Sequence, residues 1–265
     1  MAVITLTTDF GTRDPFVGVM KGRILSRLPH ASIVDLSHEI LAHWPGEAGF
    51  WLARCYPYFP TGTVHVAVVD PGVGTARAIA MLAAAGQIFL APDNGLLAPV
   101  AARVPDARAF HLEPAKFAEL GLGRPSATLH GRDIFAPLAA ELAAGRATLA
   151  DYGQPVDELI PGWLEEPVVG TDQIHGAIVT IDHFGNLISN IEGAMLERWV
   201  EPQVYIGSQM LPVRRTYGDA EPGRALALVN SFGVVEIAVA EGRASELLGL
   251  SRGAPLVVRD AVRHR

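Results

Sequence analysis

Segments with strand and helix patterns alternate along the first 150 residues, and this alternation limits the fold more than any other feature. Runs of β-branched and apolar residues predict short strands at Val3–Thr8, Ser32–Leu36, Thr63–Val69 and Ile88–Ala91. Between them, apolar residues spaced three and four apart predict helices over 16–28 and 48–56. Such a succession is typical of an α/β domain, with a mostly parallel sheet and covering helices.

Three of these predicted strands end at or near an aspartate, namely Asp9, Asp70 and Asp93. Ligands of parallel sheets bind beyond the carboxyl ends of the strands, so the coincidence indicates a functional edge. Asp70 and Arg77 lie seven residues apart across a Pro-Gly turn. The pair suits either a salt bridge that braces the loop or part of a site. With His130, it would form a group able to orient and deprotonate water.

The sequence changes character near residue 151. Residues 151–167 carry three prolines, two glycines and five acids, which predicts a linker. Short strands separated by turns follow at 176–181, 203–206, 225–229, 234–238 and 255–259. This spacing favours a small antiparallel β-barrel or sandwich. We therefore predict an α/β domain at 1–155 and a β-barrel domain at 168–265.

Composition excludes several classes of partner. With 21 basic and 28 acidic residues the net charge is −7, which argues against binding to nucleic acid or to an anionic membrane. The single cysteine, Cys55, excludes an intrachain disulfide and a cysteine-based zinc site. The longest apolar run, Ala78–Ala85, has eight residues, far below the ~20 that span a bilayer. Without a secretory signal pattern at the start, we expect a cytoplasmic protein with a small-molecule partner.

The second domain offers two polar turns after apolar strands. They are Asp182-His183-Phe184-Gly185-Asn186 and Asn230-Ser231-Phe232-Gly233. Each combines an aromatic ring with polar groups, a mixture that suits a purine and an amino-acid moiety. Two ordinary hairpin turns would have the same pattern.

Two other functions compete at this point. A metal-dependent hydrolase would draw its ligands from Asp9, Asp14, His38, Asp70, Asp93, His130 and Asp133. The sequence nevertheless lacks H-x-H, H-x-x-x-H and D-x-D-x-D clusters. A non-catalytic adenosine-binding protein would need only the polar turns.

A series of motifs resembles the S-adenosylmethionine (SAM) hydroxide adenosyltransferases, also called SAM hydrolases, from residue 4 to about residue 259. The motifs are Thr7-Thr8-Asp9-Phe10-Gly11, Val34-Asp35-Leu36-Ser37-His38, residues 62–75 (GTVHVAVVDPGVGT), residues 91–97 (APDNGLL), His130-Gly131-Arg132-Asp133-Ile134-Phe135, residues 181–187 (IDHFGNL) and Asn230-Ser231-Phe232-Gly233.

The resemblance implies an α/β N-terminal domain joined to a C-terminal β-barrel. It also implies a homotrimer that binds its substrate between the N-terminal domain of one subunit and the C-terminal domain of its neighbour. The implied reaction is hydrolysis of SAM to adenosine and L-methionine by in-line attack of water at the ribose 5′ carbon. Some family members would act on the (R)-sulfonium epimer, and the residues leave the choice of epimer open. The reaction needs no cofactor and no metal. The halogenases of the family carry tyrosine where this chain has Asp70, so the resemblance favours a hydrolase over a halogenase.

The resemblance assigns roles in the first domain. Asp70, Arg77 and His130 would be catalytic, with the base left open between Asp70 and His130. Asp9 would hold the ribose hydroxyls, for which a carboxylate is well suited. Gly131 would lie where the nucleophile enters.

In the second domain, Asn186 would contact the adenine edge and Phe184 would pack near the nucleoside. Asp182 and Ser231 would bind the methionine ammonium, and Glu236 is a further candidate contact. The halogenases have an arginine for the methionine carboxylate at the position of Phe232. The resemblance therefore supplies no partner for that carboxylate here.

Overall fold

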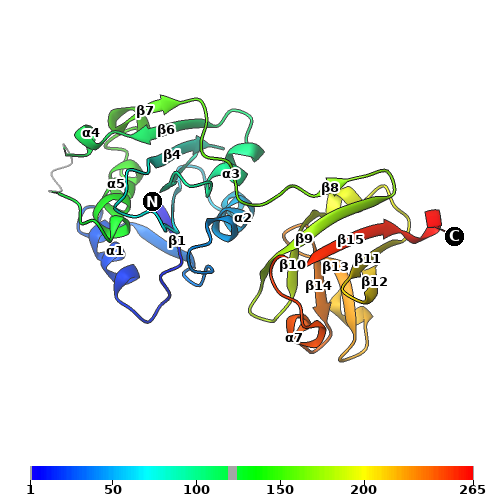
Figure 1. The fold of residues 1–265 in the computed structure, drawn as a ribbon. Helices are drawn as coiled ribbons and strands as arrows, with labels where there is room; N and C mark the ends of the chain where they lie inside the picture. Colours follow the sequence, from blue (N-terminus) through cyan, green and yellow to red (C-terminus); the bar gives the residue numbers. More distant parts are fainter. Residues whose placement is uncertain (1, 119–123, 265) are drawn as a thin grey trace. The chain divides into compact units, whose positions relative to one another are not determined.

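The computed structural model describes residues 2–118 and 124–264. The chain divides into two compact units, Met1–Trp163 and Leu164–Arg265, which are coloured blue to green and green to red in Figure 1. We describe each unit by itself.

The N-terminal unit is built on a seven-stranded sheet with the order β2-β1-β3-β5-β4-β6-β7. The pairings from β2 to β5 are parallel and those from β5 to β7 are antiparallel. The predicted α/β class is confirmed, and the sheet is mixed. The strands are β1 (Val3–Thr8), β2 (Ser32–Ser37), β3 (Val64–Val68), β4 (Ile79–Ala84), β5 (Gln87–Pro92), β6 (Arg108–Leu112) and β7 (Gly153–Val156).

The antiparallel half of the sheet contains three strands that the sequence did not predict. β4 arises from the apolar run at 78–85 and forms a hairpin with β5, because Ala85 and Gly86 both have positive φ, at 52° and 71°. β7 lies inside the predicted linker and pairs with β6. The linker prediction is therefore wrong for residues 153–156.

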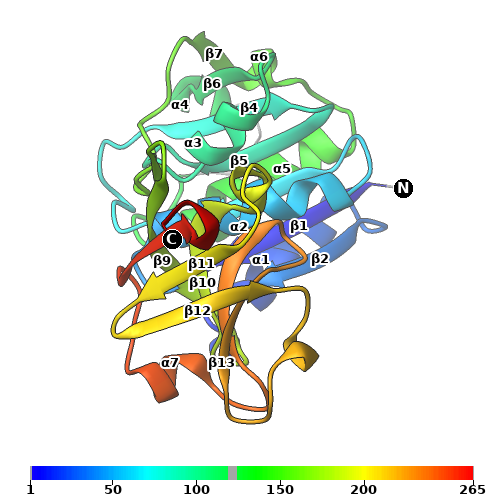
Figure 2. The ribbon, with the colours of Figure 1, turned by 90° about the vertical axis from the view of Figure 1, so that its right-hand side faces the viewer.

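Helices cover both faces of this sheet (Figures 1 and 2). One core packs beneath α1 and α5, with Met20 and Leu138 fully buried. A second core packs beneath α2 and α3, with Val100 fully buried. The helices are α1 (Phe16–Leu25), α2 (Pro45–Cys55), α3 (Ala98–Arg103), α4 (Pro114–Ala118), α5 (Ala136–Ala143) and α6 (Leu149–Tyr152), and a π-helical turn at Gly131–Phe135 precedes α5.

A buried histidine ties the three central parallel strands together. His65 on β3 is fully buried, with Nδ1 2.7 Å from Thr5 Oγ1 on β1 and Nε2 2.7 Å from Gln87 Oε1 on β5. Burial lowers the pKa of His65 to about 4, so the ring is neutral at neutral pH. These bonds fix the strands whose carboxyl ends lead to Asp9 and Asp70.

The C-terminal unit is a closed barrel of seven strands. Its order is β10-β14-β13-β12-β11-β15-β9, and a β9–β10 pairing closes it. The predicted barrel is confirmed, although the β12–β13 pairing is parallel. The strands are β9 (Gln173–Ile181), β10 (Leu187–Glu192), β11 (Pro202–Ile206), β12 (Gln209–Arg214), β13 (Ala225–Val229), β14 (Val234–Val239) and β15 (Pro255–Asp260).

Apolar side chains from all sides fill the barrel, among them Ile178, Val204, Val235 and Val258. The unit also contains the short strand β8 (Val168–Val169), which pairs with β9, and helix α7 (Ala244–Leu248). Short 3-10 turns occur at Tyr56–Tyr58, Gly193–Leu196, Tyr217–Asp219 and Ala261–His264. Across the described parts of both units, every helix is too short or too polar to cross a membrane.

Candidate active site

Asp70, Arg77 and His130 meet beyond the carboxyl end of β3. Arg77 Nε donates to both carboxylate oxygens of Asp70 over 3.0 Å, and Arg77 Nη2 also donates to Asp70 Oδ2. The same Nη2 lies 2.8 Å from His130 Nδ1. The Asp70 side chain is 5% exposed and that of Arg77 11%, so this ion pair is shielded from bulk water, while His130 is half-buried. The structure thus brings the three predicted catalytic residues together.

Hydrogen bonding fixes the form of His130. A guanidinium can only donate, so His130 Nδ1 must be the accepting nitrogen and the ring proton lies on Nε2. Burial lowers the pKa of His130, and the charge of Arg77 lowers it further. Asp70 and Asp133 oppose this shift without reversing it. His130 is therefore neutral at neutral pH.

A close approach between two loops holds the three residues in register. Gly74 has φ +78°, and a Cβ there would collide with the carbonyl oxygen of Ala127. The turn is closed by Thr75 Oγ1, which donates to Gly72 O over 2.6 Å and accepts the Arg77 N–H over 3.3 Å. Only glycine permits the loop of Arg77 to pack this tightly against the segment that leads to His130.

Asp133 anchors the segment on the other side of His130. Its carboxylate accepts hydrogen bonds from Arg132 Nε over 2.6 Å and from Ser126 N over 2.9 Å. These bonds, the one from Arg132 foremost, hold the pKa of Asp133 well below its usual range. Asp133 and Arg132 thereby brace the π-helical turn at 131–135, a type of distortion that is frequent at functional sites.

The predicted ribose-binding residue lies in the loop that follows β1. Asp9 Oδ2 accepts the main-chain N–H of His43 over 2.9 Å. The next residue, Phe10, lies beside Gly131: a Cβ placed on Gly131 would come within 3.3 Å of the Phe10 ring and 3.0 Å of Met20 Sδ. The Asp9 loop is therefore a neighbour of the turn that follows His130.

The third strand-end aspartate has a structural role. Asp93 Oδ2 lies 2.8 Å from His111 Nε2, and Oδ1 accepts the Ile160 N–H over 3.0 Å. Within residues 2–118 and 124–264, no group of three or more histidine, cysteine, aspartate or glutamate side chains is arranged to hold a metal ion. The candidate ligands of a metal-dependent hydrolase are thus not gathered into one site.

The β9–β10 turn carries two predicted binding residues in direct contact. Asp182 Oδ1 accepts the Asn186 main-chain N–H over 2.8 Å, and Asp182 Oδ2 accepts Asn186 Nδ2–H over 2.9 Å. Gly185 has φ +86° and packs against Arg243, where a Cβ would come within 2.8 Å of the arginine Cβ. The carboxylate therefore orients the amide of Asn186 rigidly.

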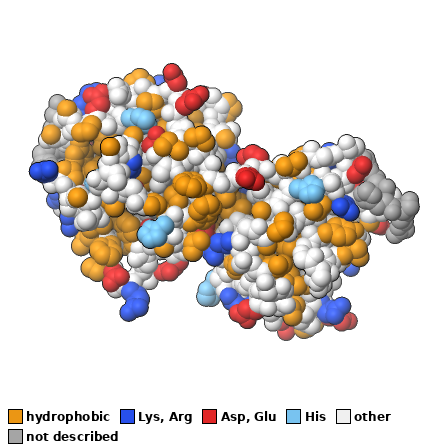
Figure 3. Space-filling model, in the orientation of Figure 1, with side chains coloured by type: hydrophobic (Ala, Val, Ile, Leu, Met, Phe, Trp, Pro, Cys, Tyr) orange, Lys and Arg blue, Asp and Glu red, His pale blue; other side chains and the backbone are white. Residues whose placement is uncertain are grey.

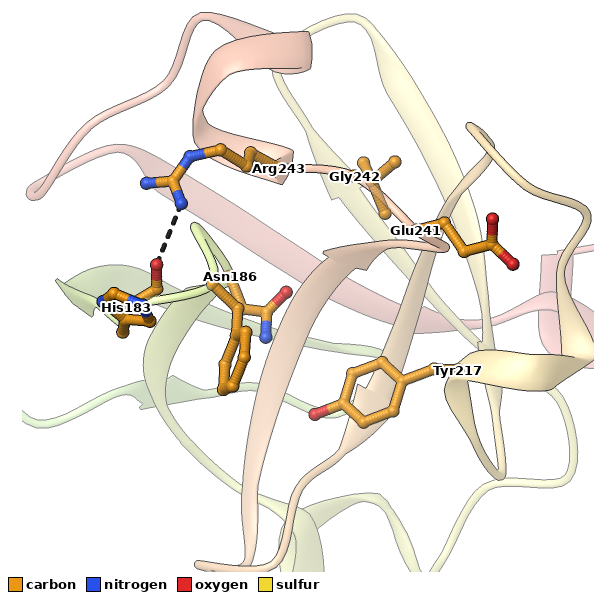
Figure 4. A pocket seen from close by; sticks show the side chains of 8 residues that line it. His183, Asn186, Tyr217, Glu241, Gly242 and Arg243 are labelled. Atoms are coloured by element: carbon orange, nitrogen blue, oxygen red, sulfur yellow. Dashed lines mark hydrogen bonds between the residues drawn. The ribbon is translucent and has the colours of Figure 1, made fainter.

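This turn forms one wall of a pocket of about 580 Å³ in the C-terminal unit (Figure 4). Arg243 Nη1 donates to His183 O over 2.9 Å at its rim, and Figure 4 shows the Tyr217 ring and the Asn186 amide on either side of the space. The pocket is lined by His183, Phe184, Asn186, Tyr217, Val239, Glu241, Gly242 and Arg243. Phe184 and Asn186 were predicted from sequence; Tyr217 and Arg243 were not, because no local motif marks them.

Glu236 lies behind this pocket and supports it. Glu236 is 2% exposed; Oε1 accepts the Tyr217 hydroxyl over 2.8 Å, and Oε2 accepts Asn230 Nδ2–H over 3.0 Å. Burial raises the pKa of Glu236, and burial together with Glu236 raises the pKa of Tyr217. Ser231, next to Asn230, is exposed.

Figure 3 shows a mixed outer surface, with orange apolar side chains interspersed among charged ones on both units.

Comparison with family models matches both units. Residues 4–153 match the SAM hydroxide adenosyltransferase N-terminal domain, and residues 176–257 match the C-terminal domain of the same family.

Similar proteins match over nearly their whole length. An (R)-S-adenosyl-L-methionine hydrolase of Thermus thermophilus is 38% identical over 97% of this chain and 99% of the relative. One of Salinispora arenicola is 40% identical over 96% and 97%. A fluorinase of an Actinoplanes species is 29% identical over 89% and 90%. The crystal structure of an uncharacterized conserved protein from Thermotoga maritima has a TM-score of 0.89 and 32% identity, covering 97% of this chain and 99% of that one.

Proposed function

The chain belongs to the SAM hydroxide adenosyltransferase family, and from this premise we propose that it hydrolyses (R)-S-adenosyl-L-methionine to adenosine and L-methionine. The observation that carries the proposal is the guanidinium of Arg77, hydrogen-bonded at once to Asp70 and to a neutral His130. The names of the relatives at 38% and 40% identity support both the reaction and the choice of epimer.

The reaction is an in-line displacement at the ribose 5′ carbon. A water oxygen forms the new bond to this carbon while the bond to the sulfonium sulfur breaks, and its electron pair leaves with the sulfur. The departing thioether of methionine is neutral, so no general acid is required on that side. The protein must align a water, shield it from bulk solvent and take up its proton.

The hydrogen bonds of the triad favour Asp70 as the proton acceptor. His130 Nδ1 is occupied by Arg77, and Nε2 carries a proton, so the neutral ring has no free lone pair in this arrangement. Asp70 Oδ2 accepts twice from Arg77, but Oδ1 accepts only from Nε and keeps one lone pair. We therefore assign His130 to holding Arg77, Arg77 to favouring hydroxide character in the water, and Asp70 to accepting the proton.

The pocket of the C-terminal unit suits an adenine base. Phe184 and Tyr217 offer aromatic surface, and Asn186 offers an amide that both donates and accepts. The bond from Asn186 Nδ2 to Asp182 fixes which way that amide faces. Asp182 also provides a negative charge for the methionine ammonium.

The remaining contacts complete the proposal. Asp9 binds the ribose hydroxyls and Gly131 lies where the nucleophile enters. Ser231 takes part in binding the ammonium, and Glu236 acts through Asn230 beside it. We expect a homotrimer that binds substrate between neighbouring subunits, uses neither cofactor nor metal, and works in the cytoplasm; each of these stays a prediction.

The deciding experiment incubates chelator-treated protein with racemic SAM in chloride buffer and follows the products and both epimers by chromatography. Adenosine and methionine formed from the (R) epimer are the expected result. A chlorinated nucleoside would identify a halogenase instead, and substrate retained without turnover would identify a binding protein. Activity that returns only with added metal would overturn the metal-free reaction.

A further inference from the structure

The last residue of β1 and the residue after β2 form a buried side-chain hydrogen bond. Thr8 is fully buried and His38 is 4% exposed, and Thr8 Oγ1 lies 2.8 Å from His38 Nδ1. The Phe10 N–H donates to the same Thr8 oxygen over 3.2 Å. The hydroxyl can give its one proton to His38 Nδ1 when the ring proton lies on Nε2, and we assign this tautomer because Asp35 Oδ1 lies near Nε2.

A register shift brings these two side chains level. Leu6 pairs with Asp35, but Thr7 pairs with Ser37, so β2 has one extra residue at Leu36. With a regular register, Thr8 would lie level with Ser37, and the extra residue brings it level with His38 instead. Bulges beside functional sites commonly re-aim a side chain in this way.

The far side of the His38 ring faces a charged pair. His38 Nε2 lies 3.1 Å from Asp35 Oδ1, although it is poorly aligned for a hydrogen bond, and Lys21 Nζ lies 2.5 Å from Asp35 Oδ2. Burial opposes the charge on Asp35, yet Lys21 and His38 together hold the pKa of that carboxyl below its usual value. A charged Asp35 favours the tautomer with the proton on Nε2 and thus leaves Nδ1 free to accept from Thr8.

The main chain ties the same two loops together. Gly11, with φ +66°, donates its N–H to His38 O over 2.8 Å. Asp9 Oδ2 accepts the N–H of His43, which itself has φ +65°. Three contacts therefore hold the loop at 9–11 to the loop at 38–43. Phe10 N–H bonds to the Thr8 hydroxyl, which contacts the His38 ring; Gly11 N–H donates to His38 O; and the Asp9 carboxylate accepts from His43 N–H.

We propose that His38 is a positioning residue, which acts through Thr8 to hold Asp9 in the geometry that binds the ribose hydroxyls. The inference rests on the proposed function, because the ribose role of Asp9 belongs to that proposal. His38 touches no substrate in this scheme. Through the Thr8 hydroxyl it fixes the position of the Phe10 N–H. The main chain at Asp9 is thereby fixed too, and with it the direction in which the Asp9 side chain points.

The test compares hydrolysis of SAM and of 2′-deoxy-SAM. Thr8→Val keeps the shape of the side chain but removes the hydroxyl, and His38→Gln moves the polar end away from the Nδ1 position. Thr8→Ser and His38→Asn are the matched controls, because they keep the hydroxyl and an acceptor near Nδ1. We expect the two breaking variants to lose about tenfold in the preference in kcat/KM for SAM over the deoxy substrate, mostly through KM, while the controls keep it.

A purely structural role would lower kcat/KM for both substrates equally and leave their ratio unchanged. An unchanged ratio would overturn the proposal for His38. So would a wild-type enzyme that hydrolyses both substrates equally well, or the failure of both breaking variants to fold. A wild-type enzyme that hydrolyses neither substrate would instead overturn the proposed function.

Discussion

The guanidinium of Arg77 carries only donors, so both of its partners must offer lone pairs. Asp70 supplies two oxygens and His130 supplies Nδ1. This asymmetry distinguishes roles that the motifs alone left open. The lone pair of His130 Nδ1 accepts from Arg77, so in our proposal His130 positions that cation. Asp70 Oδ1 still has a lone pair that can accept a proton from water.

Asparagine substitutions test this division of roles. Asp70→Asn keeps the shape but removes the proton acceptor, and we expect kcat to fall by about a hundredfold or more with little change in substrate affinity. His130→Asn keeps an acceptor near Nδ1, and its kcat should stay within about tenfold of wild type. Single-turnover rates and calorimetric Kd values measure both, with thermal unfolding as the control for folding. The reverse order of the two losses would make His130 the base.

The pH dependence of turnover follows from the same hydrogen bond. His130 accepts from Arg77 only while it is neutral, and burial and Arg77 lower its pKa from 6.5. The folded protein therefore resists protonation of His130, and the associated stability is present above pH 6.5 and is lost as pH falls below it. We expect the acid limb of kcat to have its midpoint below pH 6.5. This limb should disappear in His130→Asn, and an unchanged limb in that variant would assign it to another group.

At the scale of elements, the contact between two loops sets the position of the triad. Gly74→Ala would force a Cβ onto the Ala127 carbonyl at a positive φ. We expect it to destabilise the protein by about 2 kcal/mol or more and to reduce kcat, because Arg77 would move relative to His130. Gly62→Ala is the matched control, since Gly62 has φ +85° but nothing lies within 4 Å of its Cβ position. Its cost should be only about 1 kcal/mol, with kcat unchanged. Equal effects of the two variants in urea unfolding and turnover would contradict this role for Gly74.

The elements also show how far local sequence patterns reach. Strands rich in β-branched residues, such as β1 and β3, were predicted closely. β4, with the sequence IAMLAA, has low strand propensity and becomes a strand because β5 and β6 pair with it on both sides. Tyr217 escaped prediction for a similar reason: it lies in a 3-10 turn, and its place in the pocket depends on Glu236, 19 residues away on β14. Asp70 and His130 were recognisable because each lies within a distinctive motif, and Arg77 because it follows the motif of Asp70 by two residues, across the same turn.

At the scale of the whole molecule, the predicted catalytic residues and the predicted adenine pocket belong to different units of the chain. If the protein is a homotrimer whose sites are shared between subunits, two differently damaged variants can form active sites together. A monomeric enzyme would not show this recovery. In hybrid trimers, a subunit with Asp70→Asn still has an intact C-terminal domain, and a subunit with Phe184→Ala and Asn186→Ala still has an intact N-terminal domain. Where these two intact domains are neighbours, they form one undamaged site. Random assembly of equal amounts makes about a quarter of the sites intact in both parts.

Co-expression of these two inactive variants should therefore restore about a quarter of wild-type kcat per site. Analytical ultracentrifugation checks that the hybrids are trimers, and each variant expressed alone is the negative control. If instead every site were formed within one subunit, each site would contain one damaged half and co-expression would restore nothing. Recovery of activity thus reports directly on whether neighbouring subunits share a site, because no single chain in the mixture is intact.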